Sequence, residues 1–209
     1  MRILVTGGCG FIGSALVLHL VNDLGHEVCT LDTMTYAANP VSLASLADNP
    51  RHAIVRTAWV VSPHRGNFVK TTLRLAAERD ALTVVDDQHG CPTSAADLAA
   101  ALAVIARRLA TDAAAPTGTF HCVNAGDITW RGFAEAIVAG SARRGGCAVP
   151  VKGIPTSAYP TPARRPANSR LSTDSLTAAY GVAPRPWQAA LDDILDRLVG
   201  PVTEGVSKP

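Results

Sequence analysis

A glycine-rich turn between an apolar strand and an apolar helix is the feature that most limits what this chain can fold into. The run Arg2–Thr6 has strand length, and Gly7, Gly10 and Gly13 follow it at three-residue spacing before a run of helical length. Gly7 allows a tight exit from the strand, Gly10 lets backbone N–H groups approach a pyrophosphate, and Gly13 lets the helix pack closely on the strand. This order predicts a phosphate-binding strand, turn and helix.

An acidic residue stands where a dinucleotide-binding unit needs one. Asp32 ends a second apolar run, Glu27–Leu31, nineteen residues after Gly13. A carboxylate at this place can accept hydrogen bonds from the adenosine ribose hydroxyls. Aspartate repels a ribose 2′-phosphate, and the next three residues include no arginine to receive one, so the sequence favours NAD over NADP. A structural turn beside a surface aspartate remains the alternative.

The rest of the chain alternates between strand and helix patterns, which predicts an α/β fold with a parallel sheet. A continuous strand is expected over His52–Val61, although Arg56 is unusual inside an apolar run. Residues Pro155–Arg170 are rich in proline and arginine and predict a loop that faces a substrate. Later strands are expected at Leu82–Val85, Thr119–Val123 and Val149–Ile154, and helices at Asn67–Arg79, Ala95–Leu109, Thr129–Val138, Thr173–Tyr180 and Pro186–Leu198.

Composition excludes several classes of protein. The formal net charge is only +2 and no basic stripe is present, so nucleic acid is not an expected partner. No apolar run approaches the ~20 residues that cross a bilayer, so we expect a cytoplasmic protein without a membrane partner. The five cysteines are scattered without CxxC pairs and the histidines lack ligand spacing, so no metal site is predicted.

Two family resemblances divide the chain. The turn TGGCGFIG resembles the extended short-chain dehydrogenase/reductase superfamily, and LDTMTYAANPVSLASL is similar to dTDP-glucose 4,6-dehydratase. From Arg56 onward RTAWVVSPHRGNFVKTTLRLA, VVDDQHGCPTSAADLA, FHCVNAGDITWRGFAEAI and RRPANSRLSTDSL resemble dTDP-4-dehydrorhamnose reductase. We therefore expect a dinucleotide-binding βαβ unit over residues 1–55, a reductase-like part with a smaller substrate-binding region over 56–200, and a tail over 201–209. The fold class is a truncated Rossmann-like parallel sheet.

The resemblances imply residues for two binding sites. The adenosine end of NAD would be lined by Phe11, Ile12, Asp32, Thr33, Met34 and Thr35. The site for a dTDP-sugar would be shaped by Trp59, Asn67, Gln88, Thr93 and Arg165. Two alternatives stay open here: Trp59 as a buried core aromatic, and Arg165 as part of a solvated basic loop.

A catalytic pair of this superfamily is missing from the sequence. The resemblance implies a tyrosine assisted by a lysine four residues later, but Tyr36, Tyr159 and Tyr180 are followed at that offset by proline, alanine and proline. The block from the third strand through the tyrosine helix is also absent, and the two likenesses meet near Arg56. We expect a dTDP-4-dehydrorhamnose reductase-like protein with little or no turnover, and we assign no catalytic residue. A non-catalytic NAD or dTDP-sugar binding module and a non-functional gene fusion are the alternatives.

Overall fold

The computed structural model describes residues 1–32, 38–46, 49, 52–161 and 165–202. Its compact units do not follow the order of the chain. One unit combines residues 1–58, 96–123 and 171–184, and the other combines 59–95, 124–170 and 185–209. The predicted division at residue 55 describes likeness along the sequence and stays a prediction.

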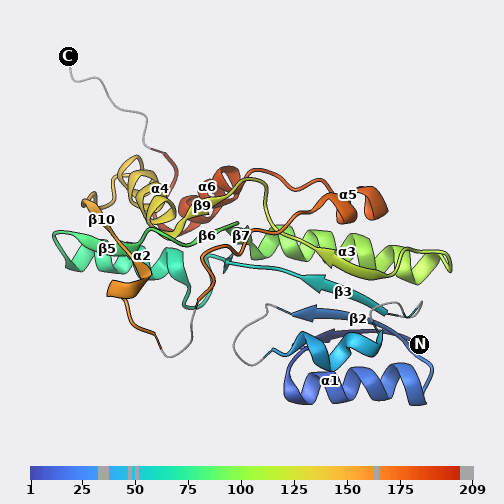
Figure 1. Ribbon diagram of the computed structural model, residues 1–209. Helices are drawn as coiled ribbons and strands as arrows, with labels where there is room; N and C mark the ends of the chain where they lie inside the picture. Colours follow the sequence, from blue (N-terminus) through green and yellow to red (C-terminus); the bar gives the residue numbers. More distant parts are fainter. Residues whose placement is uncertain (33–37, 47–48, 50–51, 162–164, 203–209) are drawn as a thin grey trace. The chain divides into compact units, whose positions relative to one another are not determined.

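The first unit is built on a four-stranded parallel sheet in the order β1-β2-β3-β8 (Figure 1). This confirms the predicted α/β fold with a parallel sheet. The elements of this unit are β1 (Arg2–Thr6), α1 (Phe11–Leu18), a π-helical turn (His19–Asp23), β2 (Glu27–Asp32), a 3₁₀ helix (Pro40–Leu46), β3 (His52–Arg56), α3 (Ala95–Thr111), β8 (Gly118–His121) and α5 (Asp174–Tyr180).

A hydrophobic core joins α1 to one face of this sheet. Val17 of α1 is fully buried against Val5 of β1 and Val28 of β2, and Leu43 and Leu46 of the 3₁₀ helix close the cluster. The strands are apolar and the helix presents apolar residues to them, so burial of this face drives their association. The glycine turn is thereby fixed at the carboxyl end of β1.

β1 lies at an edge of the four-stranded sheet among the described residues. Among the described residues β1 pairs with β2, while doubly wound folds place their first strand inside the sheet. Leu4 of β1 is 48% exposed, and Ile12 and Leu16, one helical turn apart on α1, are also exposed. An apolar strand edge is therefore left uncovered by the described part of the chain.

The second unit packs helices around short strand pairs. Its elements are β4 (Val60–Val61), α2 (Phe68–Glu78), β5 (Leu82–Val85), β6 (His89–Gly90), β7 (Thr93–Ser94), β9 (Ile128–Thr129), α4 (Trp130–Ala142), β10 (Val151–Ile154), a 3₁₀ turn (Thr156–Ala158) and α6 (Trp187–Leu198). β5 pairs in parallel with β10, β4 in parallel with β7, and β6 antiparallel with β9. Phe133 and Ile137 of α4 meet Leu191 and Leu195 of α6 in the core of this unit.

The prediction of one strand over His52–Val61 is wrong. β3 ends at Arg56, β4 begins at Val60, and the two strands belong to different sheets and different units. Trp59 between them has φ 48°, a left-handed conformation that a strand cannot contain. An apolar composition alone does not reveal such a break.

Candidate functional site

The glycine turn has the geometry that its spacing predicts. Gly7 has φ 68° and donates its N–H to Leu31 O at 2.8 Å, which ties the exit of β1 to β2. Gly10 N–H is donated to Gly7 O at 3.0 Å, and Gly10 is the N-cap of α1. A Cβ on Gly13 would lie 2.1 Å from Gly7 O, so only glycine permits this approach of helix to turn. The first turn of a helix leaves N–H groups without intrahelical partners, which suits an anionic ligand.

Asp32 is joined directly to this turn. It is the last residue of β2, is 6% exposed, and its Oδ2 accepts the N–H of Cys9 at 2.8 Å. A carboxylate that accepts a backbone N–H holds the turn in place as well as offering charge to a ligand. The carboxylate therefore has a structural role whether or not it binds ribose.

The remaining residues predicted for the adenosine end are only partly described. Ile12 lies in the first turn of α1 with its side chain 80% exposed, and Phe11 is the first residue of that helix. Thr33, Met34 and Thr35 lie outside the described residues. The structure thus brings Gly7, Gly10, Gly13 and Asp32 together, and the other assignments stay predictions.

Sequence reasoning did not assign three residues that lie at the turn or in the strands that follow it across the sheet. A Cβ on Gly8 would lie 2.3 Å from Thr30 Cγ2, so this glycine is also required by packing. Arg56 of β3 is the register partner of Asp32, and His121 of β8 is the register partner of Arg56. Motif spacing could reveal Gly8, but only the order of the strands places Arg56 next to Asp32 and His121 next to Arg56.

Trp59 is held within an aromatic cluster of the second unit. Its ring stacks on Trp130 with centroids 3.5 Å apart and planes 11° from parallel. Gly90 makes room for it, because a Cβ there would lie 2.3 Å from Trp59 Cε2. Trp59 is only half-buried, so part of it remains open to solvent or a ligand.

Thr93 is a neighbour of Trp59 through a hydrogen bond between their backbones. Its N–H is donated to Trp59 O at 3.1 Å, and it is paired with Val60 in the β4–β7 ladder. The Thr93 side chain is 1% exposed, and its hydroxyl is donated to Cys91 O at 3.1 Å. Thr93 therefore supports the position of Trp59 in this structure.

Asn67 organises the loop before α2. Its Oδ1 accepts the N–H groups of Val69 and Lys70, which makes it the N-cap of the helix. Its Nδ2 donates a hydrogen bond to Ser62 O at 2.7 Å. The amide is fully engaged in local structure, so any effect on a ligand would act through this loop.

Gln88 is attached to the loop expected to face the substrate. It is 9% exposed, and its Nε2 donates a hydrogen bond to Thr156 Oγ1 at 2.9 Å. Asp87 accepts the N–H and the hydroxyl of Thr156, and these hydrogen bonds hold the pKa of Asp87 below its ordinary value. The start of the loop is thereby fixed to residues that follow β5.

The end of the same loop is anchored near β6. His89 N–H is donated to Ala167 O, and Ser169 N–H to His89 O, each at 2.8 Å. Arg170 Nη1 is 3.2 Å from Asp127 Oδ2 in an exposed ion pair. Arg165 between these anchors is exposed, a position compatible with a phosphate contact and with a solvated loop.

The described tyrosines are poor substitutes for the missing pair. Tyr180 is 6% exposed, its hydroxyl is donated to Pro116 O, and burial raises its pKa to about 12. Tyr159 is 58% exposed, and alanine stands four residues after it. Tyr36 lies outside the described residues. Neither described tyrosine has a lysine one helical turn away to assist it.

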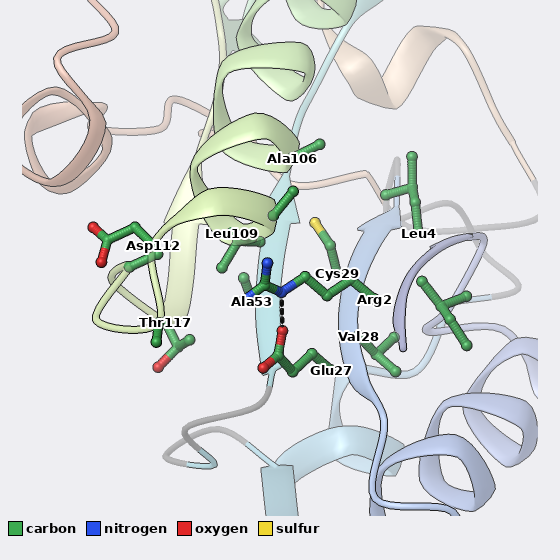
Figure 2. Close-up of a pocket in the computed structure, with 14 residues that line it drawn as sticks. Arg2, Leu4, Glu27, Val28, Cys29, Ala53, Ala106, Leu109, Asp112 and Thr117 are labelled. Carbon is green, nitrogen blue, oxygen red and sulfur yellow. Dashed lines mark hydrogen bonds and ion pairs between the residues drawn. The ribbon is translucent and has the colours of Figure 1, made fainter.

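A cavity of about 240 Å³ lies elsewhere in the first unit, where the starts of β1, β2 and β3 meet the C-terminal part of α3. Figure 2 shows Arg2 and Glu27 joined in an ion pair beside Cys29 and Leu109. Burial raises the pKa of the Cys29 thiol to about 11, which leaves it unreactive near neutral pH. Because this cavity is at the amino ends of the strands, it is separate from the glycine turn at the carboxyl end of β1.

No grouping of three or more metal-ligating side chains occurs among the residues that the structure describes. In the same residues, no helix has both the length and the apolar character to cross a bilayer.

Comparison with known families decides the relationship of the chain. The RmlD substrate binding domain family matches residues 41–199. The chain belongs to this family. The dTDP-4-dehydrorhamnose reductase of Sinorhizobium fredii (strain NBRC 101917 / NGR234) is 45% identical over 141 residues, which is 67% of this chain and 48% of that protein. This member of the RmlD family therefore spans about half the length of the curated relatives it matches.

Solved structures give the same fold. The crystal structure of a dTDP-4-dehydrorhamnose reductase from Clostridium acetobutylicum ATCC 824 aligns with a TM-score of 0.67 at 25% identity, over 95% of this chain and 99% of that one. The Bacillus anthracis str. Ames reductase in complex with NADP aligns with a TM-score of 0.64 at 20% identity, over 93% and 98%. The dTDP-glucose 4,6-dehydratase of the same organism, in complex with NAD, aligns at 0.53 and 11% identity, over 94% and 96%. The last two likenesses concern the fold alone.

Proposed function

We propose that this chain is a dTDP-4-dehydrorhamnose reductase-like protein of dTDP-L-rhamnose biosynthesis that binds a nicotinamide dinucleotide and a dTDP-sugar but has impaired turnover. The observation that carries the proposal is the family match over residues 41–199, preceded by a glycine turn that Asp32 holds in shape. A relative that is 45% identical to this chain is named as a dTDP-4-dehydrorhamnose reductase. Their reaction is the reduction of a dTDP-4-keto-6-deoxy sugar by a nicotinamide hydride.

Two groups of residues would bind the two ligands, one the coenzyme and the other the sugar nucleotide. The N–H groups at the start of α1 and the Asp32 carboxylate would hold the coenzyme. Trp59 would offer an aromatic surface to the sugar nucleotide, and Arg165 a guanidinium to its diphosphate. Asn67, Gln88 and Thr93 would position these groups, since each is hydrogen-bonded to the adjoining loops.

Impaired turnover follows from the missing tyrosine and lysine. Reduction of a ketone needs a proton on the oxygen as hydride arrives at the carbon, and a positioned acid typically contributes ~10² to 10⁴ in rate. Tyr180 is buried and its hydroxyl donates a hydrogen bond to Pro116 O. Neither Tyr180 nor Tyr159 has a lysine four residues later. Binding without turnover would make the protein a nucleotide-sugar or coenzyme-binding module.

The exposed edge of β1 favours a homo-oligomer. A second copy could cover Leu4, Ile12 and Leu16, which the described part of this chain leaves exposed.

Calorimetry and a turnover assay test the proposal together. Purified protein is titrated with NAD, NADP and dTDP-rhamnose, and oxidation of reduced coenzyme is then followed with the dTDP-4-keto sugar. We expect binding of coenzyme and sugar nucleotide, with a rate at least ~10²-fold below that of a full-length reductase. A folded protein that binds neither ligand would contradict the proposal, and a rate equal to that of a full-length reductase would contradict the impairment.

A further inference from the structure

Three charged or titratable residues stand in a row at the carboxyl end of the sheet in the first unit. Asp32 of β2 is paired with Arg56 of β3, and Arg56 is paired with His121 of β8. Direct partners in a parallel ladder project to the same face of the sheet. The carboxyl ends of parallel strands are also where α/β folds bind their ligands. The row therefore adjoins the glycine turn that follows β1.

Arg56 has unused hydrogen-bonding capacity in this row. Its Nε atom is buried and has no hydrogen-bond partner among the described residues. The hydroxyl of the next residue, Thr57, is also buried without a hydrogen-bond partner among the described residues, and Thr57 is 2% exposed. Buried polar groups in folded proteins are normally satisfied, so an orphaned guanidinium N–H at a ligand-binding edge points to an external acceptor.

The positive charge of Arg56 is close enough to the glycine turn to affect the pKa of Cys9. Burial raises the pKa of the Cys9 thiol, the negative charge of Asp32 raises it further, and the positive charge of Arg56 opposes both. Cys9 lies between Gly8 and Gly10 and donates its N–H to Asp32. A ligand held by this turn would thus meet a carboxylate and a guanidinium side by side.

We infer that Arg56 is a specificity-determining residue that binds a phosphate on the adenosine ribose, so that the site accepts a dinucleotide with a 2′-phosphate. The inference rests on the proposed coenzyme binding at the glycine turn. Asp32 by itself repels a 2′-phosphate, and the three residues after it supply no cation. Arg56, brought from β3, offsets that repulsion and offers the forked donors that match phosphate.

Ligand fragments test this without relying on a variant. Wild-type protein is titrated by calorimetry with 2′,5′-ADP, with 5′-AMP and with inorganic phosphate. We expect 2′,5′-ADP to bind at least about tenfold more tightly than either of the others, because it alone carries both adenosine and the 2′-phosphate. Equal affinity for 2′,5′-ADP and 5′-AMP would overturn the inference, and so would inorganic phosphate binding as tightly as 2′,5′-ADP.

Two variants and a matched control complete the test. In Arg56→Gln we expect NADP affinity to fall by about 10- to 100-fold and NAD affinity to change by less than about threefold. Arg56→Lys keeps the charge and should retain an intermediate affinity for NADP. Arg108→Gln removes an exposed arginine of α3 paired with Asp112 and should change neither affinity.

The outcomes separate this inference from the proposed function. Wild-type protein that binds NAD but does not prefer NADP or 2′,5′-ADP overturns the role of Arg56 and leaves coenzyme binding intact. Wild-type protein that binds neither coenzyme overturns both. If Arg56→Gln fails to melt cooperatively, the wild-type fragment titrations decide the matter.

Discussion

Asp32 and Arg56 are direct partners in the parallel pairing of β2 with β3, so residues that are far apart in the sequence project side by side at the carboxyl end of the sheet. Asp32 is tied to the glycine turn through Cys9, and the buried Arg56 Nε has no hydrogen-bond partner among the described residues. This pairing links the N-terminal dinucleotide motif to the part of the chain that matches the RmlD family.

Replacing Arg56 should change the titration of His121. Burial holds the pKa of His121 below its ordinary value, a backbone hydrogen bond with Ser172 opposes this, and the positive charge of Arg56 lowers the pKa further. In Arg56→Gln we expect the pKa of His121 to rise. This pKa is measured by NMR of the imidazole protons, and the signals of His121 are assigned by comparison with the His121→Gln variant. An unchanged pKa, with Arg108→Gln as control, would show that the two side chains are not electrostatically coupled.

The same residue predicts a pH dependence of stability. His121 has a lowered pKa in the folded state, so the unfolded chain takes up its proton first as the pH falls below about 6.5. Its contribution to stability is full above that value and is lost as the pH falls towards the folded pKa. Once their difference above about pH 6.5 is subtracted, urea unfolding should show wild type becoming less stable than His121→Gln as the pH falls through this range, and parallel curves would contradict the prediction.

Gly13→Ala should damage the turn directly. The new Cβ would lie 2.1 Å from Gly7 O and 2.8 Å from Gly7 C, and backbone atoms cannot move aside cheaply. We expect a loss of about 1–3 kcal/mol in the free energy of unfolding, measured by denaturant titration, together with weaker coenzyme binding. Gly66→Ala is the control, since nothing lies within 4 Å of a Cβ at that position. Equal stability of the two variants would contradict the packing described here.

Gly90→Ala should disturb the stacked tryptophans. A Cβ at Gly90 would lie 2.3–2.7 Å from three ring atoms of Trp59, so the indole would have to shift from its present position on Trp130. We expect a changed near-ultraviolet circular dichroism spectrum and weaker dTDP-rhamnose binding. Trp59→Ala serves for comparison, because it removes the stack without crowding the backbone. A spectrum identical to that of wild type would mean that Trp59 does not pack on Gly90 in solution.

A charge on the edge strand should reduce self-association. Leu4 of β1 is 48% exposed on a strand whose partner among the described residues is β2, so Leu4→Lys would place a lysine where a second copy would pack. Sedimentation should show wild type as dimers or larger species and the variant shifted towards monomer. Val104→Lys is the matched control, since Val104 is 44% exposed on α3. A wild-type protein that is monomeric at all concentrations would contradict the prediction.

Local chemistry and spacing determined a large part of this protein. The strand, glycine turn and helix followed from the spacing of Gly7, Gly10 and Gly13, because each position has a steric requirement that a short segment meets by itself. The parallel α/β fold followed from the alternation of strand and helix patterns, and the absence of a tyrosine–lysine pair was readable directly.

Tertiary structure decided which distant residues became neighbours. The break between β3 and β4 depends on the left-handed backbone at Trp59, and the division into two units interleaves segments from the whole chain. The row of Asp32, Arg56 and His121 exists because β3 pairs with β2 on one side and β8 on the other. Strand order is fixed by burial and hydrogen bonding between segments remote in sequence, which residue spacing along the chain does not encode.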